Sequence, residues 1–186
     1  MLSKRAQRML ATMDRTTALW HFPVIGRAKG RIIRRLIDKH RPKRALEIGS
    51  LFGYSAILIA GSLPTGGRLT CVEANSYLAK FVKSNAARAG LGGRVKVIEG
   101  DALRVIPLLT SRFDFVLIDA AKEDYLDYLR QLEPHLVRGA VVVADNTGMN
   151  RREMRSYLHH VRRGGRYDSR EYDFGFDCME ASVFNG

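Results

Sequence analysis

Short apolar runs alternate with amphipathic segments through most of the chain. Five of these runs have the length and composition of buried strands: residues 45–49, 69–73, 95–98, 113–118 and 140–144. The segments before and between them space their apolar residues as helices do: residues 26–39, 54–62, 77–89, 102–109 and 122–136. Strands that alternate with helices predict an α/β fold, in which helices cover both faces of a parallel sheet.

The N-terminal part departs from this alternation. Residues 3–13 predict a short basic helix, which the His-Phe-Pro segment at residues 21–23 interrupts. No repeat, linker or low-complexity tract divides the 186 residues. We therefore expect a single domain over residues 1–186, with residues 1–21 as a basic helical extension.

The C-terminal part departs from the alternation as well. Residues 152–161 predict one more helix, and two strand-like runs follow it at residues 167–172 and 180–184. The connection between these runs is short, so they predict an antiparallel pair at one edge of the sheet.

Charge is distributed unevenly along the chain. The net charge is +12, and residues 1–44 alone contain 13 Lys and Arg against 2 Asp and Glu. Residues 45–150 contain 11 of each kind, whereas residues 151–170 contain 7 basic and 2 acidic residues. A neutral core with a basic rim favours either an anionic partner, such as nucleic acid or a phosphorylated substrate, or simply a solvated charged surface.

Cysteine content and hydropathy indicate a cytoplasmic protein. Cys71 and Cys178 are the only cysteines, and Cys71 falls in a predicted buried strand, which favours free thiols. The apolar run at residues 140–144 is far too short to cross a bilayer, and no apolar stretch follows the charged N-terminus as in a signal peptide. We therefore expect no membrane association.

The ends of the predicted strands carry candidate cofactor-binding residues. In an open parallel sheet, ligands bind beyond the carboxyl ends of the strands. Gly49 and Gly53 follow the first strand, but they form neither a dinucleotide-binding motif nor a phosphate-binding loop, and alone they are more typical of a turn made for packing. Glu73 ends the second strand, where it can accept hydrogen bonds from ribose hydroxyls, and Asp101 after the third can accept from an adenine amino group. Together they predict a nucleoside-containing cofactor.

The next two strand ends offer hard oxygen ligands. Asp119 follows the fourth strand, and Asp145 and Asn146 follow the fifth, without an accompanying Cys or His cluster. Oxygen-only ligation suits Mg²⁺ better than Zn²⁺, although Asp145-Asn146 taken alone is more typical of a loop cap. Lys122 lies three residues after Asp119. A nearby dication would disfavour its ammonium form, so Lys122 is a candidate general base, with a solvent-facing helix lysine as the alternative.

These motifs resemble the Mg²⁺-dependent catechol and caffeoyl-CoA O-methyltransferases, which are class I S-adenosylmethionine-dependent methyltransferases. The resemblance is carried by residues 25–30, 46–49, 53–55, 118–122, 144–146 and 177–180. It implies a doubly wound, Rossmann-like fold, whose mostly parallel seven-stranded sheet has an antiparallel C-terminal edge. It also implies a set of residues around S-adenosylmethionine: Val24, Ile25, Glu47, Gly49, Gly53, Tyr54, Ser55, Glu73, Asp101, Ala102 and Asp119.

The same resemblance implies catalytic roles. Asp119, Asp145 and Asn146 would bind Mg²⁺, and Lys122 would take the proton from the substrate hydroxyl. Asn146 would also contact the substrate. Glu171 falls where these enzymes have a glutamate that contacts the second hydroxyl, although an exposed strand glutamate is equally consistent with its sequence. The expected reaction is methylation of one hydroxyl of a catechol-like molecule.

The sequence leaves the substrate and the assembly open. Residues 120–121 are both alanine, where the catechol enzymes have a tryptophan against the substrate. Residues 147–152 are polar and basic, where those enzymes have an apolar edge of the substrate pocket. A hydroxylated uridine in tRNA is therefore an alternative substrate, which the basic segments favour. A non-catalytic cofactor-binding module is the alternative of a different class. A homodimer, as in many members of the family, is a further expectation.

Overall fold

The computed structural model describes residues 2–20 and 22–186, and its centre is one sheet of seven strands. In chain order the strands are β1 (Arg44–Ile48), β2 (Arg68–Glu73), β3 (Val95–Glu99), β4 (Phe113–Ile118), β5 (Leu136–Ala144), β6 (Tyr167–Asp173) and β7 (Cys178–Phe184). Their order across the sheet is β3-β2-β1-β4-β5-β7-β6. The first five are parallel, whereas β7 pairs antiparallel with both β5 and β6. The predicted fold class is confirmed.

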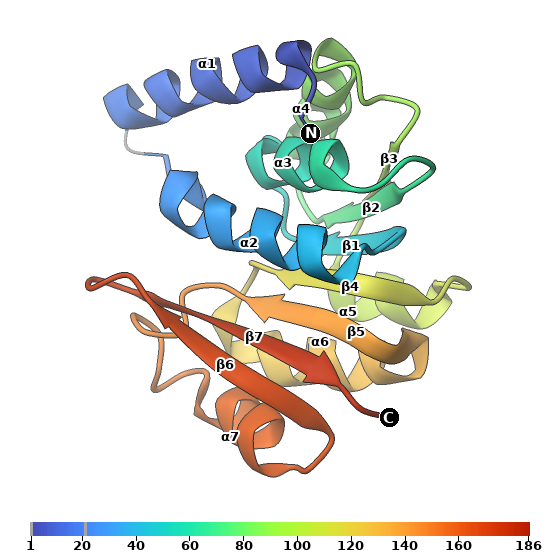
Figure 1. Cartoon of the computed structure of the whole chain (residues 1–186), viewed down its shortest axis with the longest axis vertical. Coiled ribbons are helices and arrows are strands. Elements are labelled where there is room, and N and C mark those ends of the chain that lie inside the picture. Colours follow the sequence, from blue (N-terminus) through green and yellow to red (C-terminus); the bar gives the residue numbers. More distant parts are fainter. Residues whose placement is uncertain (1, 21) are drawn as a thin grey trace.

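Helices cover both faces of this sheet (Figure 1). One face carries α1 (Lys4–Trp20), α2 (Gly26–His40), α3 (Tyr54–Ser62) and α4 (Ser76–Arg88). The other carries α5 (Ala102–Val105), α6 (Tyr125–Leu132) and α7 (Arg155–Arg163). None of the described helices is long and apolar enough to cross a membrane.

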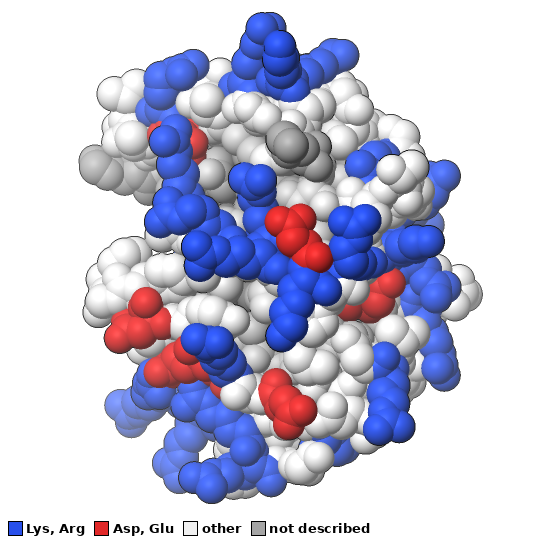
Figure 2. All heavy atoms as spheres, viewed as in Figure 1, with Lys and Arg blue, Asp and Glu red and all other residues white. Residues whose placement is uncertain are grey.

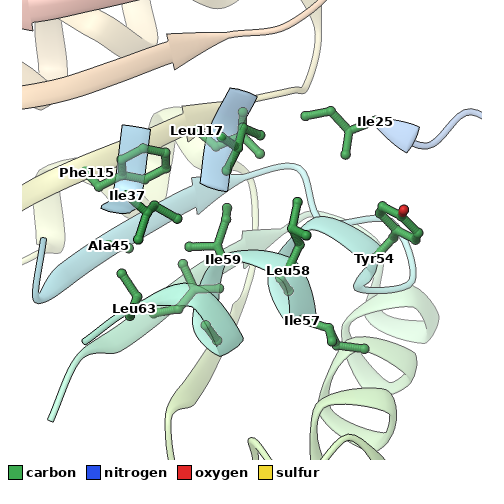
Figure 3. Packing of buried hydrophobic residues seen from close by; sticks show 14 of the residues in the cluster. Ile25, Ile37, Ala45, Tyr54, Ile57, Leu58, Ile59, Leu63, Phe115 and Leu117 are labelled. Carbon is green, nitrogen blue, oxygen red and sulfur yellow. The ribbon is translucent and has the colours of Figure 1, made fainter. Parts of the chain in front are cut away.

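The helices attach to the sheet through two apolar clusters, one on each face. Figure 3 shows the cluster around α3, where Ile59 lies toward Ile37 of α2 and Phe115 of β4, whereas Ile57 points away from them on the other side of α3. Almost every residue of α3 is buried, because α1, α2 and α4 surround it above β1 and β2. Its sequence is accordingly apolar on all sides rather than amphipathic. This packing fixes β1 and β4 as a rigid base for the loops that follow them.

The strand order reverses between β1 and β4. From β1 the chain moves outward to β2 and β3 on one side, and from β4 to β5 on the other. The loop after β1 and the loop after β4 therefore run to opposite faces of the sheet. They leave a crevice at the carboxyl ends of these two strands. The crevice lies where the sequence places the candidate chemistry.

The ends of several elements differ from the sequence prediction. The basic helix extends to Trp20 rather than ending at residue 13, and His21, part of the predicted interruption, lies outside the described residues. Residues 106–108 and 133–135 form 3₁₀ turns instead of continuing helices. Each of these turns contains a proline, which cannot donate the helical backbone hydrogen bond.

Strand β5 is also longer than its apolar run. It begins at Leu136, four residues before the predicted start, and Gly139 within it adopts a φ of +84°. The pairing register with β4 shifts in this region, so the irregular strand start carries no continuous apolar pattern.

Candidate active site

The turn after β1 lies against the end of β4. Gly49 has a φ of +80° and Gly53 a φ of +94°, both in the left-handed region that favours glycine. A Cβ atom on Gly49 would collide with the carbonyl oxygen of Asp119 and lie 2.9 Å from its carbonyl carbon. The turn can therefore approach the β4 loop only because residue 49 has no side chain.

Glu73, at the end of β2, holds this turn in place. One carboxylate oxygen accepts hydrogen bonds from the backbone N–H groups of Ser50 and Leu51, both at 2.9 Å. The other accepts from the N–H of Asn75 at 3.0 Å. Because a carboxylate oxygen can accept two hydrogen bonds, the Asn75-bound oxygen keeps capacity for a ligand.

A first pocket, of about 410 Å³, opens beside Glu73. Asp101 and Ala102 at the start of α5 line it, together with Leu78 of α4 and Tyr128 of α6. One oxygen of Asp101 accepts a 2.9 Å hydrogen bond from the backbone and caps α5. Its second oxygen remains to accept a hydrogen bond from a ligand in this pocket.

A second pocket, of about 270 Å³, lies on the other side of the turn. Its lining includes six of the predicted cofactor-binding residues: Val24, Ile25, Gly49, Tyr54, Ser55 and Asp119. Gly49, Leu51 and Asp119 line both this pocket and the first one. The two pockets thus form one elongated cleft across the carboxyl ends of β1, β2 and β4.

A third pocket, of about 450 Å³, adjoins the second and contains the three predicted metal ligands: Asp119, Asp145 and Asn146. Its opposite wall is apolar and includes Met149, Phe174 and Phe176. Phe174 and Phe176 belong to the connection between β6 and β7, and Phe176 and Met149 are largely exposed. A pocket with a polar floor and an apolar wall fits a small aromatic molecule with polar substituents.

Lys29 and Asp177 hold the polar floor of the third pocket. The Nζ atom of Lys29 lies 2.5 Å from Oδ1 of Asp145 and 2.6 Å from Oδ2 of Asp177. Asp177 also accepts hydrogen bonds from Nδ2 of Asn146 at 2.8 Å and from the N–H of Met149 at 2.9 Å. Lys29, Asp145 and Asp177 are all buried, so these contacts fix the directions of the Asp145 and Asn146 side chains.

The two buried aspartates have pKa values shifted in opposite directions. Burial and the nearby Asp119 carboxylate raise the pKa of Asp145 to about 6. Burial also acts to raise the pKa of Asp177, but hydrogen bonds from Lys29, Met149 and Asn146 outweigh it and lower that pKa to about 2. The mutual repulsion of Asp119 and Asp145 marks this floor as a place that additional positive charge would stabilise.

Lys122 lies at the wall of the second pocket. Its Nζ atom is 2.9 Å from Oδ1 of Asp119 and donates to the hydroxyl of Tyr125 at 2.9 Å. That hydroxyl in turn donates to the carbonyl of Ile118 at 2.9 Å. Two fixed partners therefore hold the Lys122 amine beside the residue that all three pockets share.

Three of the predicted site residues do not line these pockets in the described chain. Glu47 is fully buried under the turn, where it accepts a 2.6 Å hydrogen bond from the Ser50 hydroxyl and burial raises its pKa to about 7. Gly53 precedes α3 and shapes the turn. Glu171 accepts from Arg151 at 2.7 Å and from Arg162 at 2.6 Å, and these arginines hold it away from the third pocket. The structure brings the remaining predicted residues together in the cleft.

The sequence is similar to those of known O-methyltransferases. A sequence model described as O-methyltransferase matches residues 2–153. The chain belongs to this O-methyltransferase family. It is 34% identical over 175 residues to catechol O-methyltransferase of Sus scrofa, covering 87% of this chain and 93% of that protein. It is also 37% identical over 168 residues to a transmembrane O-methyltransferase of Propithecus coquereli, covering 84% of this chain but only 60% of that protein.

Solved structures of other O-methyltransferases have the same fold. An O-methyltransferase from Bacillus cereus in complex with SAH superposes with a TM-score of 0.84 at 25% identity, over 96% of this chain and 91% of that one. The O-methyltransferase TomG from Streptomyces achromogenes, in complex with SAM, also gives 0.84, at 26% identity over 100% of this chain and 92% of that one. The Rossmann-like methyltransferase fold expected from the sequence is thereby confirmed.

The sequence pattern assigns no role to three residues of the site, namely Lys29, Asp177 and Tyr125. Lys29 carries a recognisable signal, because it occupies the buried stripe of α2 with Ile33 and Leu36, where an apolar residue is expected. Asp177 and Tyr125 carry no such signal. Asp177 forms a hydrogen bond with Lys29, which lies 148 residues earlier in the sequence, so no local pattern indicates the contact. Tyr125 has the sequence pattern of an ordinary buried helix residue.

Proposed function

We propose that the chain transfers a methyl group from S-adenosylmethionine to one hydroxyl of a small aromatic molecule with two vicinal hydroxyls, with the help of Mg²⁺ or another divalent cation. The observation that carries this proposal is that Asp119 lines all three pockets. A cofactor cleft and an acceptor pocket that share a wall hold the methyl donor beside the acceptor. Such proximity supplies a large part of the acceleration of a transfer reaction.

The first two pockets fit the two ends of S-adenosylmethionine. Glu73 and Asp101 offer carboxylate oxygens for ribose hydroxyls and for the adenine amino group in the first pocket. Ile25 and Tyr54 give the second pocket a partly apolar lining. When bound, S-adenosylmethionine supplies an electrophilic methyl group on a positively charged sulfur. A partly desolvated pocket favours a reaction in which that charge disappears.

The floor of the third pocket fits a hard divalent cation. Asp119 and Asp145 supply carboxylate oxygens, and Asn146 uses its amide nitrogen on Asp177, which leaves the amide oxygen for a metal. The described residues contain no group of three His, Cys, Asp or Glu side chains suited to a metal, so the proposed site would take its third protein ligand from the amide oxygen of Asn146. A bound Mg²⁺ would supply positive charge to the developing oxyanion of the acceptor.

Lys122 is the proposed general base. As a neutral amine, its Nζ accepts the proton of the acceptor hydroxyl, and the Asp119 carboxylate at 2.9 Å stabilises the ammonium that forms. The Tyr125 hydroxyl keeps the amine at the wall of the second pocket, beside Asp119. A cation on Asp119 would favour the neutral amine before the reaction, because like charges repel.

The surface charge favours a second candidate substrate, a hydroxylated uridine in RNA. Figure 2 shows Lys and Arg side chains gathered across the middle of one face, over α2, and the whole chain carries a net charge of +12. Such a surface attracts a phosphodiester backbone, and binding of this kind weakens steeply as salt is added.

The test is methyl transfer from labelled S-adenosylmethionine to a dihydroxyphenol, with Mg²⁺ and after chelation by EDTA. We expect turnover that requires the cation and is lost in Asp119→Ala and Lys122→Met. Asp168→Ala removes an exposed acidic residue of β6 and serves as the matched control. Calorimetric titration of each variant with S-adenosylmethionine separates lost binding from lost chemistry. Undiminished turnover in EDTA contradicts the role of the cation, and turnover on total tRNA alone supports the RNA substrate instead.

A further inference from the structure

A separate pocket of about 510 Å³ lies at the amino ends of β1, β2, β3 and β4, whereas the proposed active site lies at the carboxyl ends. Strand β1 is five residues long, so the two sites are about 16 Å apart along the strands. A ligand in this pocket therefore does not compete for space with the cofactor or the acceptor. Four cationic side chains line the pocket: Arg44, Arg68, Arg94 and Lys96.

The positive charge of this pocket has no acidic counterpart. No Asp or Glu side chain lines it, and no acidic side chain in residues 2–20 or 22–186 forms an ion pair with any of the four cations. Asp114 in β4 instead accepts hydrogen bonds from the backbone N–H groups of Lys43 at 2.9 Å and of Arg44 at 2.7 Å. The pocket therefore differs from those of the proposed active site, which all contain Asp119.

The pairing of the strands brings these cations close together. Arg44 of β1 is the direct pairing partner of Arg68 in β2, and Thr70 of β2 is the partner of Lys96 in β3. Residues two apart on a strand point to the same face, so Arg44, Arg68 and Lys96 share one face of the sheet. Like charges directly opposite each other destabilise a sheet. An anion bound between them would remove this repulsion.

Two of the arginines are already held in place by the backbone. The guanidinium of Arg94 donates to three carbonyl oxygens in the loop before β2, at 2.7, 2.9 and 3.0 Å. Nη1 of Arg68 donates to the carbonyl oxygen of Gly93 at 3.0 Å. A guanidinium has five N–H donors, so each arginine keeps free donors for a ligand. Because these side chains are fixed in advance, a ligand loses less free energy in ordering them.

From this geometry we infer that the pocket at the amino ends of the strands binds a small molecule with a diphosphate group. A diphosphate carries more than one negative charge, which matches several cations better than a single carboxylate does. Arginine suits phosphate because its planar guanidinium donates two parallel hydrogen bonds to it. The hydroxyl residues Thr70 and Ser111 also line the pocket and offer uncharged donors.

The surroundings of the pocket are basic as well. Figure 2 shows Lys and Arg side chains along the right-hand side of the molecule, where β4 and β5 begin in Figure 1. Such a surface raises the local concentration of anions. A concave pocket of this volume fits a small ligand, whereas the phosphates of RNA lie along an extended surface. The geometry therefore favours a small diphosphate over a nucleic acid.

The experiment is calorimetric titration of the whole chain with pyrophosphate and with ADP, at low salt and with EDTA present. We expect saturable binding of one ligand per chain. The double variant Arg68→Gln/Lys96→Gln should weaken binding by at least about tenfold, the size of one charge-assisted contact. Both residues are exposed, so the fold should tolerate the change. Lys80→Gln/Lys83→Gln removes the same charge from exposed positions of α4 and should bind as wild type does.

A third variant adds a negative charge to the pocket. A Cβ atom on Gly93 would meet nothing within 4 Å, so Gly93→Asp introduces a carboxylate without a collision. This variant should also weaken binding by at least about tenfold, because its charge repels the phosphates. Thermal unfolding without ligand checks the fold of each variant. If Arg68→Gln/Lys96→Gln does not fold, Gly93→Asp decides.

Each outcome decides the inference. If neither ligand binds saturably up to about 1 mM, or if both double variants weaken binding equally, the site is overturned. Displacement of the ligand by S-adenosylmethionine would place it in the cofactor cleft and also overturn the site. Tighter binding of ADP than of pyrophosphate supports the site and identifies an organic diphosphate, whereas the reverse order supports it and identifies the free ion. If only single-stranded RNA binds, and Arg68→Gln/Lys96→Gln loses that binding, the surface belongs to RNA and the small-molecule inference fails.

Discussion

Replacing Gly49 by alanine tests whether the close approach of the β1 turn to β4 holds the site together. The new Cβ atom would collide with the Asp119 carbonyl oxygen and lie 3.2 Å from the Cα atom of Ala120. Both obstacles are backbone atoms, which cannot move aside as a flexible side chain can. The φ of +80° adds about 1–2 kcal/mol of backbone strain for alanine, and overpacking of this kind adds about 1–3 kcal/mol. We expect a total destabilisation of about 2–5 kcal/mol.

Gly66→Ala provides the matched control. Gly66 has nearly the same φ, +79°, but a Cβ atom there meets nothing within 4 Å. This variant therefore carries the backbone strain without the collision. Urea unfolding of the two variants measures the difference, at a slope of about 1–3 kcal/mol per M. Calorimetric titration should show weaker binding of S-adenosylmethionine to Gly49→Ala only. If Gly49→Ala is no less stable than Gly66→Ala, the argument from close approach is wrong.

Three further predictions concern buried charge and the proposed base. Burial raises the pKa of Glu47 from 4.5 to about 7, so the folded state loses up to about 3 kcal/mol as the pH rises between these values. Urea unfolding should therefore show Glu47→Gln gaining stability relative to wild type from pH 5 to pH 8, and a pH-independent difference would contradict this. Lys29→Met leaves Asp145 and Asp177 without their cation and should cost about 3–5 kcal/mol in the same assay. Adding Asp177→Asn should recover part of this loss, and no recovery would argue against the ion pair. Lys122→Met should lower turnover about 10²–10⁴-fold with little change in S-adenosylmethionine binding by calorimetry, and normal turnover would exclude it as the base.

Local sequence pattern determined the order of the elements and the edge of the sheet that carries the chemistry. Apolar runs of four to six residues that alternate with helices predict a parallel sheet covered on both faces, and this arrangement places the carboxyl ends of the strands at one edge. Glu73, Asp101 and Asp119 could therefore be grouped from their positions in the chain alone, and the structure places all three around the cleft. The sequence pattern placed two helix ends too late, because Pro107 and Pro134 convert the last turns of these helices into 3₁₀ turns.

Tertiary structure alone decided which side chains meet. The sequence places Glu171 near the acceptor, but Arg151 and Arg162 hold its carboxylate elsewhere, and no local pattern reveals that competition. Likewise, Lys29 reaches Asp177 only after α2 and the β6–β7 connection have packed together. Helix α1 continues to Trp20, seven residues beyond the end that the sequence pattern predicts. Hydrophobic periodicity is a local property, whereas pairing between charged side chains depends on distances set by the whole fold.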